Sequence, residues 1–314
     1  MRPGWSSGVM STLDEHSKAY LAIAIAMVSI SFASIFIKWS ETAPFVLAAY
    51  RLAFTSAILL PYLALTGGFS EIRSFKKSEI ILVLLSGIAL SFHFGLWIVS
   101  LSLTLVSTSV ILVTSHPIFV AGVSHFLLKE KVKKVAAVGI VIAFTGVALL
   151  AISDYGEGSN TLLGDLMAFL GGICAGIYFL SGRIARRKIS VVPYSFCVYG
   201  LSAAILFASG AAVGDKLIVI DGRELALFLL LAIVPTIFGH TMFNYALKKV
   251  PAHIVSTSVL GEPVGASLLA YLLLPNEIPG PLIIVGGALV VGGLYVVLAK
   301  GYSRGREEPE AEPL

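Results

Sequence analysis

Two ionisable residues each stand directly before a proline inside long apolar stretches of the chain. Glu262 precedes Pro263 in VLGEPVGASLLAYLLL, and His116 precedes Pro117 in LVTSHPIFVAGVSHFLLKEK. A charged side chain at the centre of a bilayer costs roughly 2.5–3.5 kcal/mol on insertion scales, so it is retained where it faces a cavity or a partner. The two dipeptides predict polar midpoints of two membrane helices that flank a substrate path. The alternative for Glu262 is a structural ion pair with Arg51 or another cation.

Pro117 and Pro263 also predict breaks in these two helices. A proline has no backbone N–H, so the carbonyl four residues earlier loses its helical donor. The carbonyls concerned are those of Val113 and Val259. Inside a membrane, such a carbonyl is tolerated where it lines water or protein. A carbonyl left unpaired in this way can bind a cation or an ammonium group.

Two histidines repeat one spacing at corresponding places in the chain. His93 and Trp97 are four residues apart, and so are His240 and Asn244. Residues at this spacing share one face of a helix. A role in the path and a hydrogen bond between packed helices are both open for each histidine.

Arg51 and two tyrosines complete the candidate set. The planar guanidinium of Arg51 suits a substrate carboxylate, with an internal ion pair as the alternative. Tyr50 and Tyr178 offer aromatic faces to an amine, or serve as packing residues. The predicted path is lined by Glu262, His116, His93, Trp97, His240, Asn244, Arg51, Tyr50 and Tyr178. We expect no catalytic residue, no metal site and no cofactor.

The composition is that of an integral membrane protein. Of the 314 residues, 57% are hydrophobic and 13% are charged, and the mean hydropathy is +0.93. Soluble domains are about 45–50% apolar. Apolar stretches close to the ~20 residues that a helix needs to cross a bilayer recur along the chain. The segments between them are too short to form a soluble domain. The predicted helices span roughly residues 19–38, 44–65, 79–99, 103–127, 134–152, 162–182, 191–213, 224–246, 251–274 and 281–299.

The basic residues give this ten-helix topology an orientation. Lys and Arg near the ends of membrane helices accumulate on the cytoplasmic side. With both termini inside, 18 of the 22 basic residues fall in cytoplasmic segments, Lys216 and Arg223 fall outside, and Lys38 and Arg51 lie within or at the edge of helices. We therefore expect a multi-pass protein of the cytoplasmic membrane with both termini in the cytoplasm. The stretch MSTLDEHSKAY leaves translation from Met1 or Met10 open.

The chain contains an internal repeat. Aligning Pro117 with Pro263 sets an offset of 146, and His93 matches His240 at 147. Five helices are an odd number, so a second copy must enter the membrane from the opposite side, as in the inverted repeats of transporters. The predicted divisions are a cytoplasmic segment 1–18, a first repeat 19–152, an outer linker 153–161, a second repeat 162–300 and a disordered cytoplasmic tail 301–314.

These residues resemble a known family. The stretches PFVLAAYRLAF and GHTMFNYALKKVPA, and the HP and EP dipeptides followed by Lys129-Glu130 or Asn276-Glu277, are similar to the EamA family of the drug/metabolite transporter superfamily. The resemblance covers about residues 18–300 and implies ten helices around a central cavity, with export or exchange of amino acids and other small metabolites. It departs from the family pattern at His116, which stands where Glu262 stands in the other half, and at Pro275-Asn276.

The sequence favours a secondary transporter that moves a small polar metabolite, such as an amino acid or related amine, by alternating access. A channel or a scaffold remains an alternative. The Gly265-Ala266-Ser267 element of an intramembrane serine protease is a remote one, while the phosphate loop of an ATP-driven pump is absent from the sequence. The expected partners are the bilayer, a small-molecule substrate and no nucleic acid. Proton coupling and a homodimer stay open.

Overall fold

The computed structural model describes residues 14–104, 109, 112–153, 162–273 and 280–300, and these residues form helices joined by turns. The first part of the chain contains α1 (Glu15–Ile30), α2 (Ala33–Trp39), α3 (Pro44–Leu65), α4 (Gly68–Arg73), α5 (Lys77–Leu103), α7 (His116–Phe126) and α8 (Lys134–Ser153). The second part contains α9 (Leu162–Ala185), α10 (Val191–Ala212), α11 (Gly222–Leu231), the π-helix η1 (Ala232–Thr241), α12 (Met242–Ala246), α13 (Ala252–Ser258), the 3₁₀ turn η2 (Val259–Gly261), α14 (Glu262–Leu273) and α15 (Pro281–Lys300). The predicted all-α fold is confirmed for these residues.

Eight helices of the described chain are long and apolar enough to cross a bilayer. The apolar part of α8, Lys134–Leu149, is shorter. The predicted helix 103–127 lies partly outside the described residues, and α7 forms its second part. The structure therefore supports a multi-pass membrane protein, whereas ten helices in two inverted repeats stay a prediction.

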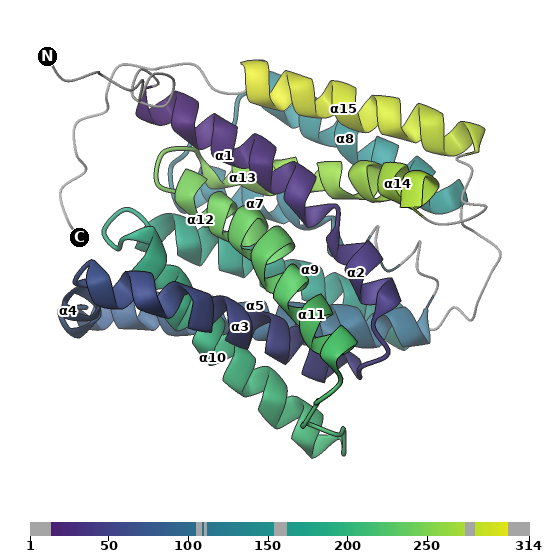
Figure 1. The fold of residues 1–314 in the computed structure, drawn as a ribbon. Helices are drawn as coiled ribbons and strands as arrows, with labels where there is room; N and C mark the ends of the chain where they lie inside the picture. The colour runs from purple at the N-terminus through teal and green to yellow at the C-terminus, as the bar shows by residue number, and fades with distance from the viewer. Residues whose placement is uncertain (1–13, 105–108, 110–111, 154–161, 274–279, 301–314) are drawn as a thin grey trace, which may run out of the picture.

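The largest helix contacts join the two parts of the chain. α3 packs against α10, α5 against α9, α8 against α15, and α7 against α13, while α1 lies along η1 and α12. Figure 1 shows α8 and α15 side by side along one edge of the bundle and α3 beside α10 at the other. By its position in the chain, α1 corresponds to α9, and the helix formed by α11, η1 and α12 corresponds to α5. The contact of α1 with η1 and α12 therefore has its counterpart in the contact of α9 with α5. The other pairs map onto themselves.

Small residues allow the close approach of α8 and α15. A Cβ atom added at Gly146 would lie 2.5 Å from the carbonyl oxygen of Gly286, and one added at Gly293 would lie 2.5 Å from the backbone nitrogen of Ala143. Glycine at such positions lets two membrane helices pack backbone against backbone, which maximises van der Waals contact where lipid removes the hydrophobic driving force.

Several predicted helices are interrupted. The segment predicted as one helix over 19–38 turns at Ser31 and Phe32, between α1 and α2. α14 crosses this turn closely, because a Cβ atom added at Gly265 would lie 2.0 Å from the Ser31 hydroxyl. Helices also begin at the two dipeptides, α7 at His116 and α14 at Glu262. The predicted span over 19–38 is supported, because Glu15–Trp39 is long and apolar enough to cross a bilayer. The turn inside it was not predicted, because no proline in this part of the sequence marks it.

The predicted helix 224–246 is continuous, but its middle ten residues form the π-helix η1. Pro235 lies inside it. The hydroxyls of Thr236 and Thr241 donate to carbonyls five residues earlier, those of Leu231 at 2.7 Å and Thr236 at 3.1 Å. Such wide turns are rare and frequently occur at functional sites.

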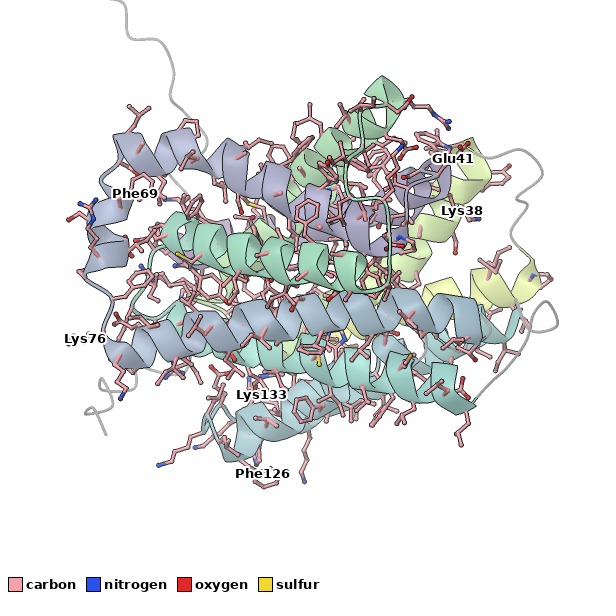
Figure 2. The ribbon with its side chains drawn as sticks, turned by 90° about the horizontal axis from the view of Figure 1, so that it is seen from below. Lys38, Glu41, Phe69, Lys76, Phe126 and Lys133 are labelled. Carbon is pink, nitrogen blue, oxygen red and sulfur yellow. The ribbon has the colours of Figure 1, made fainter. Side chains whose placement is uncertain are left out.

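The bundle has two ends of different character. Figure 2 shows Lys76 at one end of the helices and Lys38 and Glu41 at the other. We call the end with Arg73, Lys76, Arg183, Arg187 and Lys188 the basic face. We call the end with Lys38, Glu41, Arg223 and Glu224 the opposite face.

Candidate functional site

Arg51 is a buried cation at the contact of three helices. It lies on α3 and is 3% exposed. Its Nε donates to the Thr236 hydroxyl at 2.7 Å, and Nη2 donates to the Pro235 carbonyl at 3.4 Å. The guanidinium carbon lies 5.0 Å from the centre of the Phe94 ring, within cation–π range. The π-helix η1 thus offers Arg51 a hydroxyl and a carbonyl instead of a carboxylate.

Glu262 begins α14, and its carboxylate has neither a hydrogen bond nor an ion pair in the part of the chain that the structure describes. It interacts electrostatically with Arg51, but the two side chains are not in direct contact. Glu262 lies deep in the protein and keeps part of its surface accessible. The structure therefore does not show the direct ion pair with Arg51 that the sequence left open, and the carboxylate is available to a ligand.

Two histidines lie near Arg51, and a third lies near one of them. His93 Nδ1 is 3.1 Å from the Gly171 carbonyl, and its ring is stacked with Trp97 at 6.3 Å between centroids. The His240 ring meets the Phe94 ring at 5.8 Å. His93 and His240 interact electrostatically with Arg51 and with each other, and His116 interacts with His93.

Some polar atoms of this group have no hydrogen-bond partner among the described residues. They are Nε2 of His116, Nδ1 of His240 and Nε1 of Trp97, all shielded from solvent. An unpaired buried donor or acceptor costs about 1–3 kcal/mol. A polar ligand or water between the helices would supply the missing partners. A chain of neighbours links Glu262 to Arg51, Arg51 to His93 and His240, and His93 to His116 and Trp97. We call these six residues the central group.

Asn244 and Tyr178 belong to a closed hydrogen-bond network beside the central group. The Asn244 side-chain oxygen accepts from the Tyr178 hydroxyl at 3.0 Å, and its nitrogen donates to Tyr199 at 3.1 Å and to Ser195 at 3.4 Å. Tyr199 also contacts the Thr241 hydroxyl at 3.1 Å. These side chains join α9, α10 and α12 and are fully buried. Asn244 is thus occupied by protein partners, while the Tyr178 ring still meets His240 at 6.3 Å.

Tyr50 does not join the central group. Its hydroxyl donates to the Leu217 carbonyl at 3.1 Å, and its ring stacks on Phe228 at 4.8 Å. Leu217 lies in the connection between α10 and α11. Tyr50 therefore fixes this connection to α3 instead of facing Glu262.

The carbonyls that the prolines were expected to free have partners inside the chain. The ring of His116 bonds to the Val113 carbonyl at 3.1 Å through Nδ1. The Glu262 N–H donates to the Val259 carbonyl across the 3₁₀ turn. The prediction that both carbonyls are left unpaired is thus wrong, because the tight turn and the histidine ring satisfy them.

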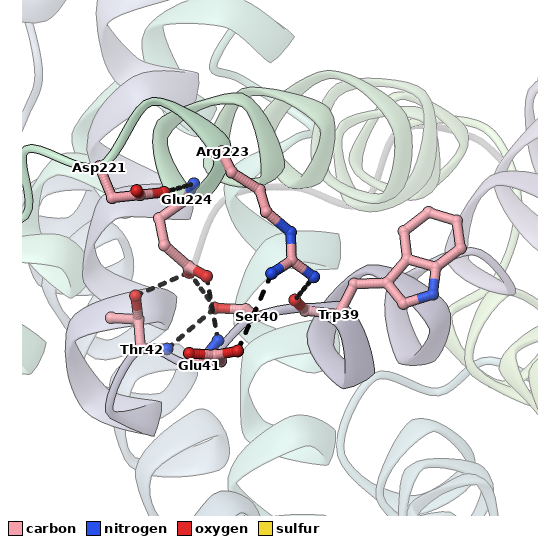
Figure 3. Close-up of polar contacts among 7 residues, drawn as sticks. All are labelled: Trp39, Ser40, Glu41, Thr42, Asp221, Arg223 and Glu224. Atoms are coloured by element: carbon pink, nitrogen blue, oxygen red, sulfur yellow. Dashed lines mark hydrogen bonds and ion pairs between the residues drawn. The ribbon is translucent and has the colours of Figure 1, made fainter.

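Two carboxylates outside the predicted set of path residues bind across the bundle. At the opposite face, Glu224 accepts hydrogen bonds from the Ser40 hydroxyl, from the Thr42 hydroxyl at 2.7 Å and from the Glu41 N–H at 3.0 Å (Figure 3). At the basic face, Glu130 accepts from Arg183 Nε at 2.6 Å. A signal for Glu224 was present, because Asp221 and Glu224 have the spacing of a helix start, and the Asp221 side chain accepts from the Glu224 N–H at 2.9 Å.

The serine of the protease alternative is hydrogen-bonded within its own helix. The Ser267 hydroxyl donates to the Pro263 carbonyl of its own helix at 2.8 Å, not to a histidine. No group of three or more His, Cys, Asp and Glu side chains that could hold a metal is found within the described ranges.

A family model and several proteins match this chain. The model, described as the EamA-like transporter family, matches residues 17–152 and residues 162–299, which we call the first and second matched ranges. The "Uncharacterized transporter" of Archaeoglobus fulgidus is 26% identical over 292 residues, covering 91% of this chain and 99% of that protein. The "Uncharacterized transporter YetK" of Bacillus subtilis is 27% identical over 310 residues, covering 94% and 89%.

Two further matches are more distant. A "Probable terminal-alkyne amino-acid exporter" of Streptantibioticus cattleyicolor is 20% identical over 200 residues, covering 64% of this chain and 66% of that protein. A solved crystal structure at 19% identity superposes with a TM-score of 0.78, covering 91% of this chain and 99% of the other. The latter likeness shows a shared fold.

Proposed function

We propose that this chain, which belongs to the EamA-like transporter family, is a secondary transporter that moves small polar metabolites by alternating access. Its relatives carry transporter names, and the family resemblance seen in the sequence is thereby confirmed. The family domain occurs twice in the chain. We further place the second copy in the opposite orientation to the first, with both termini in the cytoplasm.

The observation that carries the proposal is the central group. Arg51 and Glu262 carry opposite charges, lie within electrostatic range and do not neutralise each other by direct contact. A structural lock would bring such charges together, because an unpaired charge in a low-dielectric interior is costly. A binding site leaves them apart, so that a ligand can complete both.

The symmetric helix pairing supports alternating access. Two related halves that meet along matching helices can rock about a site between them and expose it to each face in turn. The central group draws on both matched ranges, since Arg51 and the first two histidines come from the first and His240 and Glu262 come from the second.

The charges of the central group favour a zwitterion. A substrate ammonium would meet Glu262, and a carboxylate would meet Arg51. Amino acids and related amines fit this pattern, and one distant relative carries the name of an amino-acid exporter.

The test uses the purified full-length chain in liposomes loaded with unlabelled amino acids. Uptake of radiolabelled amino acids should saturate and be accelerated by counterflow. Glu262→Gln should lower the initial rate about tenfold or more, because a hydrogen bond to a charged group contributes about 1.5–3 kcal/mol. Glu15→Gln, which changes an exposed carboxylate paired with Lys18, is the matched control.

Two results would contradict the proposal. Unchanged uptake by Glu262→Gln removes this carboxylate from the mechanism. A flux that grows linearly with concentration and shows no counterflow indicates a channel. Repeating the assay with an imposed pH gradient decides whether protons are coupled.

A further inference from the structure

The two parts of the broken helix formed by α13, η2 and α14 have different surroundings. All seven residues of α13 are buried. By contrast, no residue of α14 whose burial the structure describes is buried. α13 packs against α7 and α9 toward the basic face, whereas α14 makes fewer contacts with its neighbours. The bundle around Glu262 is therefore more tightly closed on the side of the basic face.

One carboxylate holds this closed side together. Glu130, in the connection between α7 and α8, accepts from Arg183 Nε at 2.6 Å, from the Ala252 N–H at 3.2 Å and from Arg187 Nη2 at 3.5 Å. Arg183 also donates to the Leu247 carbonyl at 2.6 Å. Glu130 belongs to the first matched range, and its partners belong to the second. We call these contacts the Glu130 clamp.

The backbone places Glu130 in this position. Lys129 has a φ of 55°, in the left-handed region that residues other than glycine rarely adopt. The Glu130 N–H then donates back to the Ser124 carbonyl at 2.9 Å. This turn ends α7 and directs the carboxylate across the bundle.

The closed side carries unpaired polar atoms that oppose its closure. Both ring nitrogens of His253 and the Ser124 hydroxyl are buried without a hydrogen-bond partner in the described chain. His253 is 1% exposed and interacts electrostatically with Glu130, Arg183 and His125. Separation of α13 from α7 would let water reach these atoms, which favours opening. The clamp is the charged contact that acts against it.

The geometry points to the Glu130 clamp as the gate that closes the substrate path toward the basic face, so that the structure holds a conformation closed on that side. This inference rests on the proposed transport function and adds the residue that controls access to the central group. The Glu224 contacts at the opposite face are of another kind, because they join α11 to the turn before α3 and touch neither broken helix.

The test measures access to a cysteine placed behind the clamp. His253→Cys is made in full-length protein in which Cys174 and Cys197 are replaced by serine, and the protein is reconstituted in liposomes. A maleimide too polar to cross the bilayer is added from either side. His253→Cys removes a ring whose nitrogens have no partners, so the fold should tolerate it.

Labelling from the basic face should be slow with Glu130 intact and about fivefold or more faster with Glu130→Gln, as expected when a closed state loses about 1 kcal/mol. Glu71→Gln is the matched control, since Glu71 also accepts a backbone N–H across the bundle, that of Ser190 at 2.6 Å. It should leave the labelling rate unchanged.

A labelling rate that Glu130→Gln leaves unchanged overturns the gate. If that variant does not fold, Arg183→Gln removes the same ion pair from the other side, and the same expectation applies. Labelling needs no substrate, so it is independent of the transport assay. Faster labelling without saturable uptake of any metabolite would support the gate and refute the transport proposal. Unchanged labelling together with Glu262-dependent uptake would refute the gate and support the transport proposal.

Discussion

Replacing Asn244 by leucine tests whether this residue supports the site or contacts the substrate. The wild-type side chain has three hydrogen-bond partners on two neighbouring helices, Tyr178, Tyr199 and Ser195. All four side chains are 0–1% exposed, so water does not replace a lost contact. Leucine has a similar volume and neither donates nor accepts.

The cost follows from the bonds that remain. Tyr199 keeps its contact with the Thr241 hydroxyl at 3.1 Å, and the bond from Asn244 to Ser195 is long at 3.4 Å. Tyr178 loses the acceptor of its hydroxyl. One buried hydroxyl left unsatisfied costs about 1–3 kcal/mol, so we expect Asn244→Leu to lower the free energy of unfolding by about 2 kcal/mol.

The measurement is reversible unfolding in mixed detergent micelles, compared with Ser209→Ala. Ser209 lies on α10, like Tyr199 and Ser195, but its hydroxyl donates to the Ile205 carbonyl of its own helix at 2.9 Å. Its replacement should therefore lower the free energy of unfolding only slightly. The substrate concentration for half-maximal uptake should be the same in Asn244→Leu and wild type. A variant with wild-type stability and altered substrate selectivity would refute the supporting role.

Three other substitutions have expected outcomes of their own. Gly146→Ala should reduce the folded fraction in size-exclusion chromatography, because the new Cβ would lie 2.5 Å from a carbonyl oxygen of α15, while Gly292→Ala meets nothing within 4 Å and should behave as wild type. Glu224→Ala should lower the free energy of unfolding, followed by thermal denaturation, by about 1–2 kcal/mol. Glu41→Ala, at a side chain that is 88% exposed, is the near-neutral control, and equal losses in the two variants would contradict the cluster in Figure 3. Lys129→Gly should raise stability by about 1 kcal/mol, since it relieves the left-handed backbone, and a decrease would show that the lysine side chain matters more.

The helical membrane class and most helix positions were predictable from the sequence. Apolar length and turn residues are local signals, and the starts of α7 and α14 at His116 and Glu262 follow from the prolines after them. The assembly of the central group was predictable in part, because the cost of burying charge requires Glu262 and Arg51 to face the interior.

Contacts between distant parts of the chain were not predictable in this way. Glu224 and Ser40 are 184 residues apart, and the hydrogen-bond partners of Tyr50 lie 167 and 169 residues along the chain. The type of residue says which bonds a side chain can make, but the packing of α3, α10 and α11 decides which partner is near. For the same reason, the sequence could not distinguish the satisfied amide of Asn244 from the unpartnered Nδ1 of His240.

The π-helix η1 has a consequence for how this helix tolerates changes in length. A π-helix has more residues in each turn than an α-helix. The ten residues Ala232–Thr241 therefore contain more backbone than an α-helix with the same number of turns would need. Loss of one residue there can be absorbed by local conversion to α-helix, with Asn244 and its neighbours kept in register. The same loss within α9 would turn every later side chain of that helix by about 100°, moving Tyr178 off its face.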